Sequence, residues 1–403
     1  MRGVCHEQKT DAAQQRREMV QGVRRGASMR HVADRYGVAL TTVQRWVARA
    51  QGQRLDRVDW TDRPCGLPTP VNRTERQRED LVLTLRHQLR ATSDLGEFGA
   101  AAIHREWLAR GLSDPPSVRT IGLILERRGA LDHRRRTRRP PPPLGWYLPP
   151  VADGRAELDS IDIVEGLVIR GGIQVEVLNG ISLHSGLVTA WPHTVITAAF
   201  VVEALLEHWR AFGLPGYAQF DNDPIFEGPQ IHPDTIGRVA RACLSLGVVP
   251  VFVPPRETGF QAAIEGFNGL WQAKVWARFE HASLEGLQAQ SARYVTAHGQ
   301  RAAARIEAAP ARRPFPPRWR LDLQAHPQGR LIFLRRSNAQ GEVQLLGRTF
   351  AVDPLWQHRL VRAEVDLKAK RVRFYTLRRR APDQRSEERR VGKECRSRWS
   401  PYH

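Results

Sequence analysis

Three short stretches are the most informative about the fold: ELDSIDIV at residues 157–164, YAQFDND at 217–223 and PPRETGFQAAIEGFN at 254–268. The first alternates apolar and polar residues as a strand does, and the second is a short apolar run that ends in acidic residues. The third begins with a pair of prolines and continues into a pattern typical of a helix. Each stretch therefore sets a carboxylate in a strand, at a strand end or at the start of a helix.

The residues around these stretches predict an α/β domain over residues 156–282. Its elements are expected in the order β-β-β-α-β-α-β-α, with strands at 157–164, 173–178, 186–191, 217–220 and 248–253 and helices at 195–212, 231–246 and 261–280. Three strands in succession followed by alternation favour a mixed sheet flanked by helices over a doubly wound parallel sheet. Side chains from such elements can converge at one edge of the sheet.

The candidate site consists of three carboxylates, Asp159, Asp221 and Glu265, one from each stretch. Hard divalent cations such as Mg²⁺ take one or two carboxylates each and keep waters for substrate phosphates. Two such ions can clamp the attacking and leaving oxygens of an in-line phosphoryl displacement. Asp162 stays open as an alternative to Asp159, because it faces the other side of a regular strand and a bulge could exchange their roles. Glu257 is a rival to Glu265 that we expect to be solvated.

The charge of the chain is unevenly distributed. The 403 residues include 62 Lys and Arg against 42 Asp and Glu, a net charge of +20, yet residues 156–280 hold 14 acidic and 7 basic side chains. A hydrophobic content of 41% excludes a wholly disordered basic protein. A protein that merely coats nucleic acid has no need of an acidic centre, whereas an enzyme that holds cations against phosphates does.

Several function classes find no support in the sequence. The chain has no apolar run of membrane length and no secretory signal pattern, so we expect a soluble protein with no membrane partner. Its four cysteines form no CxxC pair, which argues against a disulfide framework and a cysteine-rich zinc site. No GxxxxGK[ST] motif occurs, so no nucleotide cofactor is expected.

Residues 1–52 read as a helix-turn-helix DNA-binding domain. Ser28 is expected to cap a helix that ends at the Gly37 turn, and a second helix spans 40–50. Ala33 and Val43 supply the small and the β-branched residue that such a turn packs. The second helix presents side chains able to reach phosphates and base edges: Thr41, Thr42, Gln44, Arg45 and Arg49. An ordinary helical hairpin with a solvated basic face is the alternative.

Residues 73–133 predict a second helical, helix-turn-helix-like domain, with helices at 74–90, 101–110 and from 118 after a Ser117 cap. A dimerisation or spacer bundle is the other interpretation. A basic, proline-rich linker follows at 134–155, and we expect it to lie along a duplex backbone. Its arginines are Arg134, Arg135, Arg136, Arg138 and Arg139.

The C-terminal region predicts a small β-barrel over residues 327–380, built from strands at 331–335, 342–346, 349–352, 360–367 and 371–375. Its basic residues suit duplex binding, with a merely solvated charged surface as the alternative. Residues 385–403 resemble the translation of a sequencing adapter rather than native sequence, and they are left out of the fold argument.

Together, Asp159, the Asp221–Asn222 pair and the prolines spaced ahead of Glu265 resemble the DDE catalytic core of retroviral integrases and bacterial insertion-sequence transposases. The resemblance covers about residues 156–280. It implies an RNase H-like fold in which the three carboxylates hold two Mg²⁺ or Mn²⁺ ions, with Asn222 and Asn268 in support. The implied reaction cuts a DNA strand at the end of a mobile element and joins the freed 3′-hydroxyl to target DNA. The implied partners are double-stranded DNA and further copies of the chain, in the bacterial cytoplasm at the nucleoid.

Two motif positions depart from the family pattern. Asp223 stands where Asp-Asn-Gly is usual, which a positive φ would allow, and Gly266 replaces the arginine that commonly follows the last glutamate. Two other functions stay open: a catalytically inactive DNA-binding regulator descended from a transposase, and a structure-specific nuclease with the same fold. The presence of all three carboxylates favours the transposase.

Overall fold

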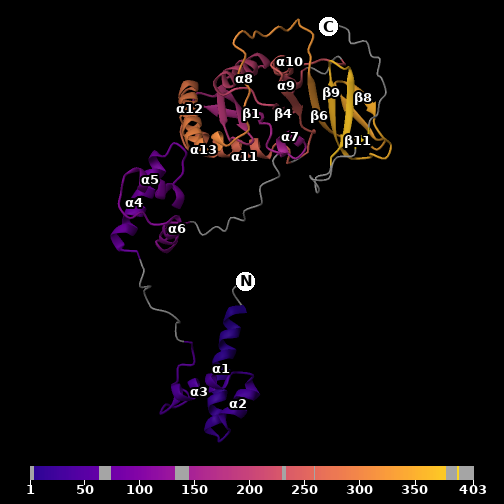
Figure 1. Cartoon of the computed structure of the whole chain (residues 1–403). Helices are drawn as coiled ribbons and strands as arrows, with labels where there is room; N and C mark the ends of the chain where they lie inside the picture. The colour runs from indigo at the N-terminus through magenta and orange to yellow at the C-terminus, as the bar shows by residue number, and fades with distance from the viewer. Residues whose placement is uncertain are drawn as a thin grey trace. The chain divides into compact units, whose positions relative to one another are not determined.

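The computed structural model describes residues 4–62, 74–131, 145–228, 233–257, 259–377 and 388–389. The chain divides into two compact units, Met1–Arg78 and Glu79–His403 (Figure 1). The predicted linker arginines at 134–139 lie outside the described residues. None of the helices that the structure describes is both long and apolar enough to cross a membrane.

The first unit is a three-helix bundle of α1 (Val4–Arg24), α2 (Met29–Tyr36) and α3 (Leu40–Ala50). The Ser28 hydroxyl accepts a hydrogen bond from the His31 N–H at 3.2 Å, which caps α2 as predicted. Gly37 ends α2 with φ +61°, a left-handed conformation that glycine adopts without strain. The two predicted helices and the glycine turn between them are therefore present, with Val43 and Trp46 in the core.

The second unit begins with three further helices, α4 (Arg76–Thr92), α5 (Ala100–Ala109) and α6 (Val118–Arg127). Their apolar faces bury Leu85, Trp107 and Ile121 in a common core. Two basic side chains of the α/β domain form hydrogen bonds with this helical region. Arg278 donates to the carbonyls of Arg90 and Ala91, each at 3.1 Å, and Lys274 donates to the Gly96 carbonyl at 3.0 Å. Arg278 thereby satisfies carbonyls that the end of α4 leaves without helical partners.

The α/β domain is a mixed sheet with helices on both faces (Figure 1). Its strands are β1 (Leu158–Ile169), β2 (Ile173–Ser182), β3 (Val188–His193), β4 (Tyr217–Phe220) and β5 (Val249–Phe252). β1, β2 and β3 pair antiparallel, whereas β4 runs parallel to β1 and β5 parallel to β4. The helices of this domain are α7 (Pro149–Ala152), α8 (Ala198–Phe212), α9 (Pro224–Glu227), α10 (Arg238–Ser245), α11 (Ala262–Trp271), α12 (Leu284–Arg301) and α13 (Ala303–Glu307). The predicted order of strands and longer helices is confirmed.

Two helix predictions need correction. The helix expected over 231–246 begins only at Arg238, after the short α9. The long helix expected over 261–280 changes character at Gln272, where α11 passes into one π-helical turn, Gln272–Trp276. Such turns are found mostly as single insertions within α-helices, often at functional sites. Here the turn precedes Arg278, which contacts the α4 region.

Period-two alternation divides β1 between two cores. Ile161 packs with α8 and α10, for example against Val201 and Val239. Val164 packs on the opposite face with Ile264 and Phe267 of α11. Odd-numbered residues before the bulge at Val164 to Leu167 therefore face α8, and even-numbered ones face α11.

The C-terminal strands occur as predicted, but they pair differently. They are β6 (Arg330–Arg336), β7 (Glu342–Leu345), β8 (Arg348–Ala351), β9 (Leu360–Asp366) and β10 (Arg371–Thr376). β6 pairs parallel with β5, and β9 and β10 continue the same sheet, while β7 and β8 form a separate hairpin (Figure 1). The expected closed barrel is thus not confirmed, because β6 satisfies the open edge of β5 instead. Of residues 385–403 only β11 (Glu388–Arg389) is described, and it pairs with β10.

Phe333 joins the C-terminal strands to the α/β core, since its ring stacks on Phe252 of β5 with centroids 5.0 Å apart. Phe333 is fully buried. We predict that Phe333→Ala lowers the free energy of unfolding by about 3–5 kcal/mol, because it removes a buried ring from a packed core. Urea unfolding of the full chain measures this. Leu355→Ala, at a residue 75% exposed, is the control that should change little. Equal midpoints for the two variants would contradict the shared core.

Candidate active site

The parallel pairing of β1 with β4 brings two of the carboxylates together. Ser160 pairs with Gln219 in the register of these strands. Continuing that register by two residues places Asp162 beside Asp221, which follows the last residue of β4. The pKa of Asp162 is raised to about 6, first by burial and then by the charges of Asp221 and Glu265, while the hydrogen bond from Asn268 lowers it. Asp162, not Asp159, is therefore the residue of the first strand that lies with the other two.

Asp221 directly follows the last residue of β4, and the loop that it begins holds it in place. Burial raises its pKa, as do the charges of Asp223 and Glu165, while the Asp223 N–H opposes them by donating to Asp221 Oδ1 at 3.0 Å. Asn222 Nδ2 donates to the Val253 carbonyl at 2.7 Å, which ties the end of β4 to the end of β5. Asn222 thus positions the loop that carries Asp221.

Asp223 has an ordinary backbone conformation, with φ −62°, so the positive φ considered for it is not observed. Its side chain accepts a hydrogen bond from the Ile225 N–H at 2.7 Å and caps α9. An aspartate is a favoured residue at this capping position. The departure from the usual Asp-Asn-Gly motif therefore has a local structural reason.

The first turns of α11 supply the remaining side chains. Asn268 Nδ2 donates to Asp162 Oδ2 at 2.7 Å, so the amide orients this carboxylate. Glu265 lies one turn earlier on the same helix and is exposed. Glu257 is not the solvated rival that we expected, because Arg336 Nε donates to it and its side chain is only 19% exposed.

Asn179 is a residue of this site that the sequence analysis missed. It lies opposite Asp162 in the antiparallel register of β1 and β2. Its Nδ2 donates to Asn268 Oδ1 at 2.9 Å, which completes a chain from Asn179 through Asn268 to Asp162. Only the strand register identifies it, because a single buried asparagine in β2 has no distinctive sequence spacing.

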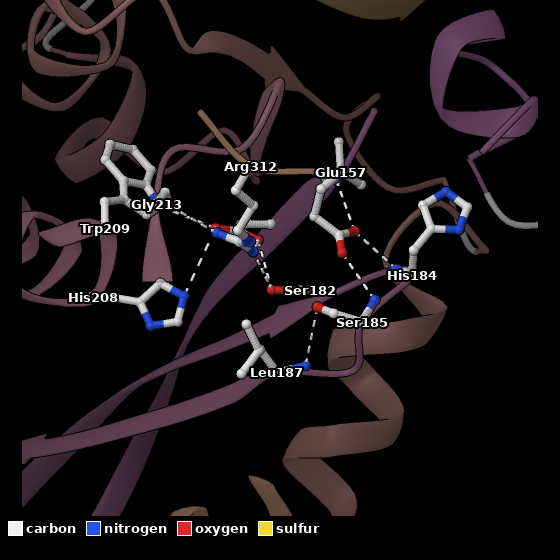
Figure 2. A network of polar contacts seen from close by, with 11 residues as sticks. Glu157, Ser182, His184, Ser185, Leu187, His208, Trp209, Gly213 and Arg312 are labelled. Atoms are coloured by element: carbon white, nitrogen blue, oxygen red, sulfur yellow. Dashed lines mark hydrogen bonds and ion pairs between the residues drawn. The ribbon is translucent and has the colours of Figure 1, made fainter. Parts of the chain in front are cut away.

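Asp159 belongs to a different, buried network on the α8 face. Figure 2 shows its partners Ser182, Trp209 and Arg312. Ser182 Oγ donates to Asp159 Oδ1 at 2.7 Å and Trp209 Nε1 donates to Oδ2 at 3.0 Å. The Arg312 guanidinium donates to both oxygens. Burial opposes ionisation of Asp159, yet the charge of Arg312 and these hydrogen bonds lower its pKa. The structure therefore does not bring Asp159 to Asp221 and Glu265, and no bulge lies between Asp159 and Asp162 to exchange them.

The donor atoms at Asp162 and Asp221 fit a divalent cation. Carboxylate oxygens are the ligands that Mg²⁺ prefers, and the ion commonly takes one or two of them while keeping waters. Across the described ranges, no three His, Cys, Asp or Glu side chains gather closely enough to hold one ion. The site thus consists of two half-buried carboxylates, Asp162 and Asp221, with the exposed Glu265 near them.

The residues predicted to contact DNA are partly available. On α3, Thr41, Gln44 and Arg45 are exposed and Thr42 is half-buried. Arg49 differs from the prediction, because its guanidinium donates to Asp59 Oδ2 and to the Thr61 carbonyl, both at 2.8 Å. Because both of these acceptors lie in the loop after α3, the Arg49 guanidinium binds that loop rather than facing outward.

Comparisons with known proteins return solved structures alone. No protein-family model matches the sequence. No curated protein matches it either. The chain is similar to the catalytic core domain of BIV integrase, at 19% identity and a TM-score of 0.26, over 34% of this chain and 80% of that one. It is similar to a chain of the simian T-cell lymphotropic virus intasome in complex with PP2A regulatory subunit B56 gamma, at 17% identity and a TM-score of 0.34, over 64% and 90%. It is also similar to the HTLV-2 integrase catalytic core domain in complex with magnesium, at 15% identity and a TM-score of 0.26, over 36% of this chain and 83% of that one. At these TM-scores the likeness does not bear on the function of this chain.

Asp162→Asn should stabilise the protein. The folded pKa near 6 exceeds the unfolded value of about 3.9, so ionised Asp162 destabilises the fold progressively as the pH rises through this window. We expect the variant to be more stable than the unaltered chain by about 1–2 kcal/mol near pH 8, with the difference shrinking towards zero below about pH 4. Urea unfolding in EDTA over this pH range measures it. A destabilised variant at pH 8 would contradict the repulsion between Asp162 and Asp221.

Asp159→Asn should have the opposite effect, because it leaves the Arg312 guanidinium buried without its counter-charge. We expect a loss of about 3–5 kcal/mol near neutral pH. A lowered folded pKa contributes stability above the unfolded pKa, so the loss should diminish as the pH falls through the folded pKa of Asp159. The double variant Asp159→Leu, Arg312→Met removes both charges and should recover much of the loss. No change in Asp159→Asn would refute the buried pair.

Proposed function

We propose that this chain is a DDE-type DNA transposase of a bacterial insertion element, a polynucleotidyl transferase that cuts a DNA strand and joins it to target DNA. The observation that carries the proposal is the juxtaposition of Asp162 and Asp221 on adjacent parallel strands, with Glu265 acting on Asp162 from α11. A half-buried carboxylate whose pKa is raised by burial and by a neighbouring carboxylate, as that of Asp162 is by Asp221, gains from a bound cation. The RNase H-like assignment of the mixed sheet is part of the same proposal.

The protein side chains have separate tasks in this reaction. Asp162 and Asp221 would hold the cations, Asn268 keeps the Asp162 carboxylate oriented, and exposed Glu265 faces the arriving DNA. Two Mg²⁺ or Mn²⁺ ions supply Lewis-acid stabilisation of the attacking and leaving oxygens when bound. In the first step water adds to phosphorus and the strand leaves with a 3′-hydroxyl. In the second step that hydroxyl attacks a target phosphodiester, and the target strand's own 3′-oxygen leaves.

The basic regions on either side of the α/β domain would bind the DNA partner. Double-stranded DNA would meet α3 through Thr41, Gln44 and Arg45, with Thr42 at the edge of that face. The net charge of +20 attracts the phosphate backbone without regard to sequence. Bringing two DNA ends together calls for more than one copy of the chain, so a homo-oligomer on DNA in the bacterial cytoplasm, at the nucleoid, completes the proposal.

Asp221→Asn should abolish Mg²⁺-dependent strand joining while leaving DNA affinity unchanged or slightly higher, since it removes a negative charge from the path of the phosphates. The assay uses the full chain, a labelled duplex copied from the inverted repeats that flank its gene, and a plasmid target. Asp162→Asn should behave alike. Glu203→Gln, at an exposed position on α8, is the matched control and should join at the unaltered rate.

Other outcomes of this assay decide between the alternatives. Joining by Asp221→Asn at the unaltered rate would refute the assignment. Cut but unjoined strands from the unaltered chain would favour the structure-specific nuclease. DNA binding with neither cutting nor joining would favour the catalytically inactive regulator.

A further inference from the structure

A buried hydrogen-bonded network adjoins the candidate site, and the mechanism proposed above does not use it. Its centre is Gln219 of β4, two residues before Asp221. Gln219 Nε2 donates to Ser160 Oγ at 3.2 Å and to the Phe260 carbonyl at 3.1 Å. Ser160 lies on β1, two residues before Asp162, and Phe260 lies two residues before the start of α11. This one amide therefore joins the three segments of chain that carry the three carboxylates.

Tyr147 completes this network from a distant part of the chain. Its buried hydroxyl donates to Gln219 Oε1 and lies 3.3 Å from the Phe260 carbonyl oxygen. Burial raises the pKa of Tyr147, so the hydroxyl keeps the proton that it donates. With this bond, the Gln219 amide uses both of its N–H donors and its carbonyl oxygen. A buried polar network whose members are all satisfied holds them in a single arrangement.

Tyr147 is itself fixed by its neighbours. Its ring packs against the Phe260 ring, with centroids 5.2 Å apart, and the Trp146 ring lies 5.8 Å from Phe260. The buried Arg362 of β9 donates to the Tyr147 carbonyl at 2.9 Å. Backbone and side chain are thus both held, so Tyr147 provides a rigid support for Phe260.

Phe260 controls the position of Glu265, because little more than one helical turn separates them. Gln261 is the N-cap residue of α11, and its carbonyl accepts a hydrogen bond from the Glu265 N–H at 2.9 Å. A shift of the helix start therefore moves Glu265 by a similar amount. The other end of the segment between β5 and α11 is also tied, since the Asn222 amide donates to the Val253 carbonyl at 2.7 Å. Residues at the end of β4 thus hold both ends of the segment that leads to Glu265.

We infer that Tyr147 is a positioning residue for the proposed reaction: it fixes Glu265 relative to the two aspartates of the site. It acts through Gln219 and the Phe260 carbonyl and touches neither cation nor DNA. The inference rests on the proposed function and extends it to a residue outside the three carboxylates. Groups that orient the ligands of a metal from behind typically change metal affinity or activity about 10–100-fold when they are altered.

The first test measures hydrogen exchange of the full chain without metal or DNA. Tyr147→Phe removes only the hydroxyl and keeps the ring against Phe260, so the fold should be retained, as circular dichroism can verify. We expect the amides at the start of α11, including that of Glu265, to exchange about tenfold faster, since one buried hydrogen bond is lost. Tyr217→Phe is the matched control, because Tyr217 is buried in the same apolar core but takes no part in this network. It should leave this exchange unchanged.

The second test asks whether Tyr147 acts through Glu265. Mn²⁺ binding to the full chain without DNA, followed by electron paramagnetic resonance, should be about tenfold weaker in Tyr147→Phe. In a chain that already carries Glu265→Gln, the same substitution should change the Mn²⁺ affinity little, because the carboxylate that it misplaces is gone. A general loosening of the fold would instead lower the affinity in both backgrounds. Gln219→Met removes the central amide and should act as Tyr147→Phe does.

The outcomes separate this inference from the proposed function. Unchanged exchange at the start of α11 in both Tyr147→Phe and Gln219→Met would overturn the inference even if strand joining is observed. A Mn²⁺ affinity that is unchanged, or that falls equally with and without Glu265→Gln, would also overturn it. Faster exchange, with a loss of affinity only where Glu265 is present, would establish it. Absence of Mn²⁺ binding by the unaltered chain would overturn both proposals, whereas absence of strand joining alone would remove only the transposase assignment.

Discussion

The parallel pairing of β1 with β4 is the constraint on which the site depends. It sets Asp162 beside Asp221 although 58 residues separate them in the chain. Placing two carboxylates side by side is unfavourable for the isolated protein, because the charge of Asp221 adds to burial in raising the pKa of Asp162. The sheet maintains this arrangement because the backbone pairing and the cores on both faces stabilise it independently. A site that is strained without a cation is well suited to bind one.

The other face of β1 carries a buried ion pair that stabilises the strand. Asp159 and Arg312 form a buried pair that joins β1 to the segment following α13, and Ser182 and Trp209 satisfy the same carboxylate. Arg313 continues this connection by pairing with Leu214 through the backbone. The strand is thus fixed from the α8 side and free to present Asp162 on the α11 side. Two aspartates three residues apart have opposite electrostatic environments because the strand alternates.

The sequence predicted the elements well because their signals are local. Periodicity and capping located α2, α3, α6 and β4 to within a residue or two, and the motif around Asp221 and Glu265 identified two members of the cluster. The choice between Asp159 and Asp162 could not be made locally, since it depends on Arg312, 153 residues away. Similarly, strands can be predicted one by one, but their joining to β5 rather than into a barrel depends on long-range pairing. The engagement of Arg49 by Asp59 is another tertiary contact that composition does not reveal.

Under the proposed function, Asp162 and Asp221 share a cation and Asp159 does not. Crystals of the full chain soaked in Mn²⁺ above about pH 7, where a carboxyl with a pKa near 6 is ionised, test it directly through anomalous scattering. We expect an anomalous peak about 2.1 Å from carboxylate oxygens of both Asp162 and Asp221, with none at Asp159. A peak at Asp159, or density that touches neither Asp162 nor Asp221, would contradict it.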